Sequence, residues 1–130
     1  MPISSQEQHS LDQVGIDQEA WPLIEEAIQI VGPVSELLDT RGMVQIARGN
    51  APQAVQDMKR AVGTTPSAIK LYHLAYTSRV AGDGEAARAA FKQAVELGLK
   101  AADVPMLERK HYDEMLLEYG DKAAAPEETK

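Results

Sequence analysis

The chain has 130 residues, a formal net charge of −7 and no cysteine, and 44% of its residues are hydrophobic although only 5% are aromatic. This length suits one compact unit with a buried core. The acidic balance argues against nucleic acid and membrane partners, because phosphate backbones and anionic lipids attract Lys and Arg. Without cysteine there is neither a disulfide framework nor a thiolate site.

The organised part of the chain is expected over residues 16–119. Residues 1–15 lack helical periodicity and are expected to be a flexible segment, and 120–130 a disordered tail. No apolar run reaches the roughly 20 residues that span a bilayer, and no signal peptide begins the chain. A soluble, cytoplasmic location is therefore the default expectation, although the sequence does not fix the compartment.

Apolar residues recur at helical spacing in six segments, and β-branched residues never gather into alternating runs, which indicates an all-α fold. The first helix is predicted over 18–31, with Asp17 as its cap and Gly32 and Pro33 as its stop. The second is predicted over 34–48. The remaining helical segments are 51–66, 67–84, 85–98 and 103–119.

The last helix is predicted to have an apolar side and a charged outer face, as the end of a helical stack requires. Its apolar side is expected to consist of Leu107, Tyr112, Met115, Leu116 and Tyr119. Its outer face is expected to consist of Glu108, Arg109, Lys110, Asp113, Glu114 and Glu118.

One pattern of small and large residues occurs twice, 33 residues apart, in two helix–turn–helix segments. Such spacing is typical of stacked helical repeats. Small residues let the two helices of a hairpin approach closely, and a glycine in each turn suits a left-handed backbone. The equivalent pairs are Gly42 with Ala75, Gly49 with Gly82, Ala54 with Ala87, Met58 with Phe91, and Ala61 with Ala94.

Two consecutive segments resemble tetratricopeptide repeats: SELLDTRGMVQIARGNAPQAVQDMKRAVGTTP and AIKLYHLAYTSRVAGDGEAARAAFKQAVELG. The phrases LLDTRG and YHLA resemble bacterial members of the family near the end of a longer array. Arg41 and Gln45 depart from the pattern, which usually has Leu and an aromatic residue there, and Leu99 stands near the expected final proline. The first unit matches at Gly42, Ala54, Met58, Ala61 and Pro66, and the second at Leu74, Ala75, Gly82, Ala87, Phe91 and Ala94.

The resemblance implies a right-handed solenoid of about two and a half repeats plus a capping helix. Its parts are a half repeat over 18–34, repeats over 35–67 and 68–100, and the capping helix over 103–119.

The resemblance also implies a binding site, because in this family the first helix of each repeat lines a concave face that receives a partner peptide. Aromatic and Arg side chains are common binding anchors. The alternative is that Tyr72 and Tyr76 pack against the next helix. A carboxylate clamp is not expected, because Asp39 and Met43 stand where Lys and Asn would be needed. The implied site residues are Asp39, Thr40, Met43, Tyr72, His73, Tyr76 and Arg79.

Catalytic and metal motifs are not found. His9, His73 and His111 are far apart, and none has a second ligand at metal-site spacing. The stretch GDGEA at Gly82 lacks the lysine of a phosphate loop and follows a helix, so it is predicted to be a hairpin turn. No Ser-centred catalytic motif is present. We therefore expect no catalytic residue, cofactor or metal, and no enzymatic activity.

The sequence thus predicts a non-catalytic protein–protein interaction module. The alternatives are a purely structural end of a longer solenoid, a self-association module, and an accessory domain of an enzyme encoded upstream. The apolar side of the first helix covers about half of its circumference, because Trp21, Ile24 and Ile28 widen the stripe. We expect either an upstream continuation of the array or self-association through the Trp21 side.

Overall fold

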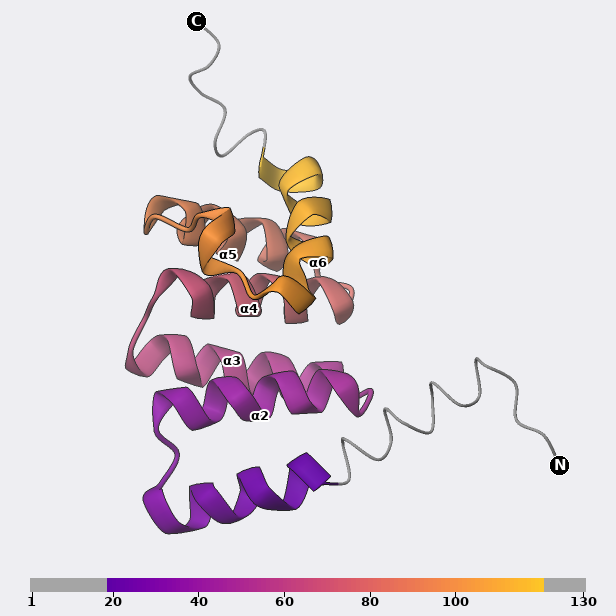
Figure 1. The fold of residues 1–130 in the computed structure, drawn as a ribbon. Helices are drawn as coiled ribbons and strands as arrows, with labels where there is room; N and C mark the ends of the chain where they lie inside the picture. Colours follow the sequence, from indigo (N-terminus) through magenta and orange to yellow (C-terminus); the bar gives the residue numbers. More distant parts are fainter. Residues whose placement is uncertain (1–18, 121–130) are drawn as a thin grey trace, which may run out of the picture.

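A computed structural model describes residues 19–120, which form six helices packed one after another along the chain, with the helices up to α5 antiparallel to their neighbours (Figure 1). The predicted all-α class is confirmed. The expected flexible segment 1–15, His9, Asp17 and residues 121–130 of the expected tail lie outside the described residues. Gly120, the first residue of the expected tail 120–130, is instead buried at the end of a π-helical turn. The amino-terminal helix spans residues 19–31. The others are α2 (Ser35–Ala47), α3 (Ala51–Thr64), α4 (Ala68–Val80), α5 (Gly84–Glu96) and α6 (Arg109–Met115).

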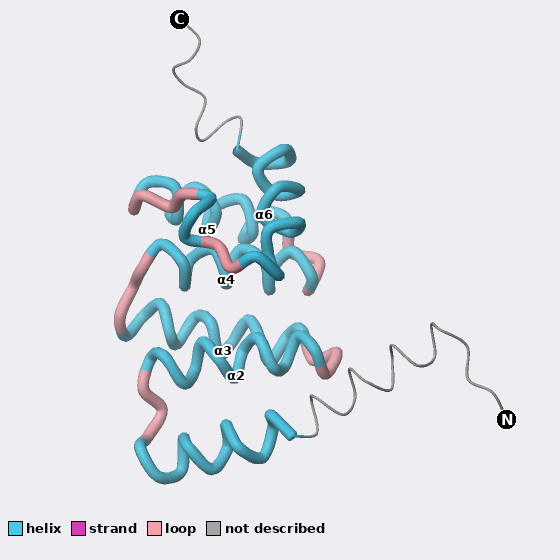
Figure 2. Tube along the Cα trace, in the orientation of Figure 1, coloured by secondary structure: helices cyan, strands magenta, loops and turns pink. Residues whose placement is uncertain are grey.

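Short loops join the helices up to α5 (Figure 2), and the two hairpins α2–α3 and α4–α5 turn in the same way. Gly49 and Gly82 have φ angles of +81° and +89°, as predicted for left-handed turn glycines. The next N–H in each turn, that of Asn50 or Asp83, donates back to the fifth carbonyl before it at 2.8 or 2.9 Å. This hydrogen bond closes the end of the preceding helix.

Small residues bring the helices of each hairpin close together, as the spacing predicts. A Cβ added at Gly42 of α2 would lie 2.8 Å from Met58 Sδ and 3.3 Å from the Ala54 carbonyl oxygen on α3. Ala54 and its equivalent Ala87 are fully buried. Close packing of this kind buries apolar surface without leaving voids.

Arg41 and Gln45, the two polar residues that depart from the predicted repeat pattern, both have polar partners. The Arg41 guanidinium donates to both carboxylate oxygens of Asp57 on α3, at 2.9 and 3.0 Å, and to Glu25 on the amino-terminal helix at 3.3 Å. The hydrogen bonds from Arg41 to Asp57 are the main cause that raises the pKa of Arg41. Gln45 accepts a hydrogen bond from the Asn50 side chain at 3.0 Å. Arg41 therefore ties together three consecutive helices.

The carboxyl-terminal segment differs from the predicted single helix over 103–119. It consists of the 3₁₀ turns η1 (Ala101–Asp103) and η2 (Met106–Glu108), then α6, then a π-helical turn η3 (Leu116–Gly120). Pro105 explains the late start, because a residue before proline avoids the helical region, and Val104 is extended at φ −92° and ψ 126°. In Figure 1 this segment runs up the page, whereas the other helices run across it.

The predicted apolar side of this segment is correct at three residues and wrong at two. Tyr112, Met115 and Tyr119 are buried against Phe91 and the rest of the α4–α5 core. Leu107 is 94% exposed and Leu116 is 36% exposed. Leu107 lies in a 3₁₀ turn and Leu116 begins a π turn, and neither keeps the 3.6-residue period on which the prediction depends.

Candidate functional site

The seven predicted site residues lie on α2 and α4, and we call the surface that they share the α2–α4 face. Asp39 and His73 meet there, with Oδ1 2.7 Å from Nδ1. Thr40 is exposed and donates to the Glu36 carbonyl of its own helix at 3.1 Å, and Met43 is half-buried. A second polar link joins the same helices, because Lys70 Nζ lies 3.2 Å from Glu36 Oε2.

A third segment reaches this face, and the sequence did not predict its presence there. Glu108 at the end of η2 places Oε1 2.9 Å from His73 Nε2, so His73 bridges α2 and the carboxyl-terminal segment. Glu114 and Glu118 lie 3.4 and 3.1 Å from the Arg79 guanidinium. All three glutamates were expected on an outward face. Glu114 and Glu118 keep about half of their side chains exposed, whereas Glu108 is 24% exposed beside His73.

The sequence did hold a signal for these residues. Asp39, His73 and Glu108 are separated by 34 and 35 residues, close to the 33-residue period of the hairpins. Extending the period from α4 would have pointed to the region around Glu108, although not to its side-chain direction.

The surroundings of His73 hold its imidazole in the charged form. The ring is almost fully buried, which alone would lower its pKa, but hydrogen bonds and charge attraction from Asp39 and Glu108 outweigh burial and raise the pKa to about 9. At neutral pH both ring nitrogens carry protons and donate to carboxylates. An imidazolium with both N–H groups engaged has no lone pair to accept a proton, so this arrangement suits a structural link between three segments.

Tyr72 is only 1% exposed and packs against the carboxyl-terminal segment. Its ring lies edge-on to Tyr112 with centroids 5.9 Å apart, and its hydroxyl donates to the Glu108 carbonyl at 3.3 Å. Burial is the main cause that raises its pKa. The position of Tyr72 matches the packing alternative, because a partner on this surface cannot reach the ring while the segment is in place.

Tyr76 also packs partly buried against the core, in line with the packing alternative, but Tyr76 and Arg79 both keep some exposure to solvent. The Tyr76 ring lies against His111 with centroids 4.7 Å apart, and the Arg79 side chain is 32% exposed between its two glutamates. Together with Thr40 and Met43, they form the part of the predicted site that another molecule could touch.

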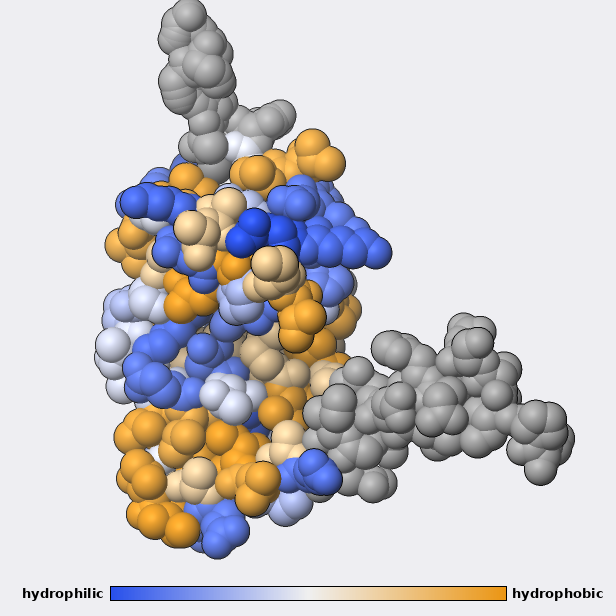
Figure 3. Space-filling model, viewed as in Figure 1, coloured by the Kyte–Doolittle hydropathy of each residue, from blue (hydrophilic) through white to orange (hydrophobic). Residues whose placement is uncertain are grey.

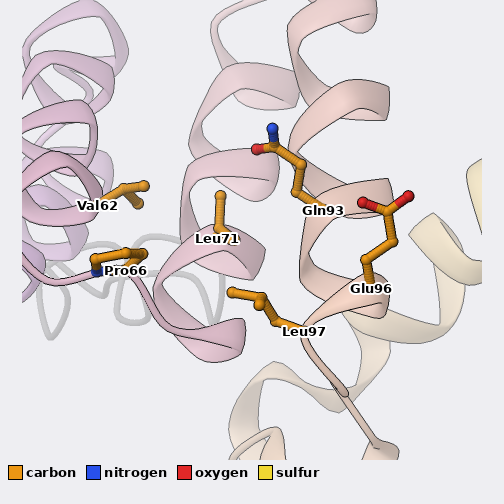
Figure 4. A pocket seen from close by; sticks show the side chains of 6 residues that line it. All are labelled: Val62, Pro66, Leu71, Gln93, Glu96 and Leu97. Carbon is orange, nitrogen blue, oxygen red and sulfur yellow. The ribbon is translucent and has the colours of Figure 1, made fainter.

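A separate pocket of about 430 Å³ lies between the hairpins (Figure 4). Its walls come from α3 and the loop after it, from α4, and from the end of α5, and it shares no residue with the predicted site. The lining residues are Val62, Pro66, Leu71, Gln93, Glu96 and Leu97. Within residues 19–120 there is no group of three or more His, Asp or Glu side chains placed to hold a metal ion.

Comparison with protein-family models, curated proteins and solved structures finds no match to the chain. Across the same described residues, no helix has the length and apolar character needed to cross a membrane.

Proposed function

We propose that this chain is a non-catalytic protein-interaction module of the tetratricopeptide type, and that its α2–α4 face binds a peptide segment of a partner protein. Support for the repeat type comes from the equivalence of the two hairpins. Residues 33 positions apart share positive φ angles at Gly49 and Gly82 and full burial at Met58 and Phe91.

The main support for the binding proposal is that the α2–α4 face combines a buried, fixed residue with side chains that are exposed to solvent. His73 is buried and held at both nitrogens, which fixes α2 relative to α4, while Thr40, Tyr76 and Arg79 reach solvent beside it. A rigid base with accessible aromatic and Arg side chains is the usual composition of a binding hot spot.

The charges on this face indicate what kind of peptide it would accept. His73 and Arg79 each face two carboxylates, so acidic groups outnumber the basic groups they pair with. A peptide with Lys or Arg would complement this excess, whereas a carboxylate terminus would be repelled. We therefore expect the bound segment to be basic.

A random peptide library displayed on phage tests this proposal. Peptides enriched on the wild-type chain should be rich in Lys and Arg, and they should lose at least about tenfold in affinity for Thr40→Lys and for Tyr76→Ala. Gln56→Lys is the matched control, because Gln56 is an exposed residue of α3 and lies off this face. Failure to enrich any peptide would contradict the proposal. So would peptides that are weakened by Gln56→Lys and not by the other two variants.

A further inference from the structure

The amino-terminal helix presents large apolar side chains to solvent. Leu23 is 66% exposed, Ile30 is 74% exposed and Val31 is 62% exposed. Figure 3 shows hydrophobic surface gathered at the foot of the molecule, over this helix and its connection to α2. Soluble proteins scatter single apolar residues over their surfaces, but a contiguous group on one helix face marks a contact surface.

The 33-residue period allows the amino-terminal helix to be compared with α3 and α5, position by position. Residues 19–31 precede the corresponding part of α3 by 33 positions and that of α5 by 66, and Ile24 is buried like its equivalents Asp57 and Ala90. The three exposed apolar residues also have exposed equivalents, but these are mostly small or polar. They are Gln56 and Ala89 for Leu23, Gly63 and Glu96 for Ile30, and Thr64 and Leu97 for Val31.

The comparison with α3 and α5 shows which side of the amino-terminal helix an additional helix would cover. Within the two complete hairpins, the equivalent positions point to solvent and are not covered by the hairpin's other helix. An additional helix packed in the manner of α2 on α3 would therefore contact the side of Trp21, the equivalent of Ala54, whose carbonyl oxygen Gly42 of α2 approaches. Such a helix would therefore leave the face of Leu23, Ile30 and Val31 uncovered, and this face would need another binding partner.

Self-association through the Trp21 side stays a prediction, and this apolar face is a different surface of the same helix. Trp21 is half-buried, and the Arg48 guanidinium lies 4.2 Å from its ring centroid. The indole is therefore covered by a residue of this chain, and the outward apolar group is Leu23, Ile30 and Val31.

We propose that this face binds the same face of a second copy of the chain, as an antiparallel helix pair with a two-fold axis near Ala27. The spacing of the side chains carries the proposal. Leu23 and Val31 stand four residues before and after Ala27, so in an antiparallel pair each Leu23 meets the Val31 of the other copy. The small Ala27 at the centre lets the helices approach closely.

The charges of the helix disfavour a membrane, and the size of the face limits the strength of the contact. The exposed charged residues of the described helix, Glu19 and Glu26, are both acidic, which disfavours an anionic lipid surface. A helix of this length presents a face about 20 Å long and about 10 Å wide. That is well below the roughly 800 Å² per partner of a standard interface, so the dimer is expected to be weak and concentration-dependent.

Light scattering and sedimentation equilibrium on the full chain, from about 10 μM to about 1 mM, test the proposal. The mass should rise from 14.1 kDa toward twice that value and no further, because a two-fold contact is closed. Leu23→Lys/Ile30→Lys should weaken dimerisation at least about tenfold. Leu107→Lys is the matched control, because Leu107 is also an exposed leucine but lies at the other end of the stack, and it should leave the dimer unchanged.

A disulfide experiment locates the axis independently. The chain has no cysteine, so Ala27→Cys introduces a single thiol. Under mild oxidation Ala27→Cys should form a covalent dimer readily, and Gln56→Cys on α3 should not.

A monomer at every concentration would overturn the proposal, and so would growth beyond a dimer or a dimer that survives Leu23→Lys/Ile30→Lys. If the wild-type chain is a monomer and dimerises only after residues 1–18 are removed, the face belongs to that segment and the proposal fails. Because the α2–α4 face takes no part in this contact, the peptide selection and the dimer measurement can fail separately.

Discussion

Replacing His73 by Gln is expected to remove a pH-dependent part of the stability of the fold. In the folded chain the Asp39 and Glu108 carboxylates raise the pKa of His73 from 6.5 to about 9, against the opposing effect of burial. Folding therefore favours the protonated ring. The stabilisation is fully present below about pH 6.5 and is lost as the pH rises through about 9.

The rise from 6.5 to about 9 corresponds to about 3 kcal/mol of folding free energy. Glutamine can donate a hydrogen bond but carries no charge, so His73→Gln leaves Asp39 and Glu108 facing each other without a cation. The variant should be less stable than the wild-type chain near pH 6. The difference should shrink by about 3 kcal/mol by pH 10, where His73 is neutral as well.

Urea unfolding of both proteins, followed by far-ultraviolet circular dichroism between about pH 6 and pH 10, measures this difference. Groups that do not contact His73 titrate alike in both proteins and cancel in the comparison. Free energies that stay parallel across the range would refute the reasoning. An imidazole pKa near 6.5 for His73, measured by NMR titration, would refute it as well.

Three further substitutions test the packing by the same unfolding assay. Gly42→Leu should destabilise the chain by about 1–3 kcal/mol or more, because its Cβ already meets Met58 and the α3 backbone; an unchanged midpoint would contradict the close approach. Gly63→Ala should stabilise by about 0.5–1 kcal/mol, because Gly63 lies in a helix with nothing within 4 Å of an added Cβ, and a loss of stability would show that this space is not free. Arg41→Leu should cost about 3–5 kcal/mol by leaving the buried Asp57 carboxylate without its main partner. Adding Asp57→Leu should recover most of that cost, and additive losses in the double variant would argue against the ion pair.

The helices and the two hairpins could be predicted because their signals are local. Gly49 and Gly82 end helices through their own backbone freedom, and the Ala residues of α3 and α5 recur with the helical period whatever packs against them. The close approach at Gly42 followed from the same small-residue pattern.

The side-chain partners on the α2–α4 face could not be predicted in the same way. Glu108 reaches His73 only because Pro105 delays the start of α6 and two 3₁₀ turns rotate the chain before it. Likewise, Arg41 pairs with Asp57 across the hairpin, and a single polar position in the sequence does not reveal its partner. These contacts depend on how the helices and the carboxyl-terminal segment are oriented relative to one another. The spacing of residues along the sequence does not contain that information.

The most direct test of the proposed function is to locate a selected basic peptide on the chain, by NMR chemical-shift perturbation of the backbone amides. We predict the largest shifts within α2 and α4, around Thr40, Met43, Tyr76 and Arg79, with smaller shifts at His111 beside Tyr76. Shifts confined to residues 19–31, or to the pocket between the hairpins, would contradict binding at the α2–α4 face.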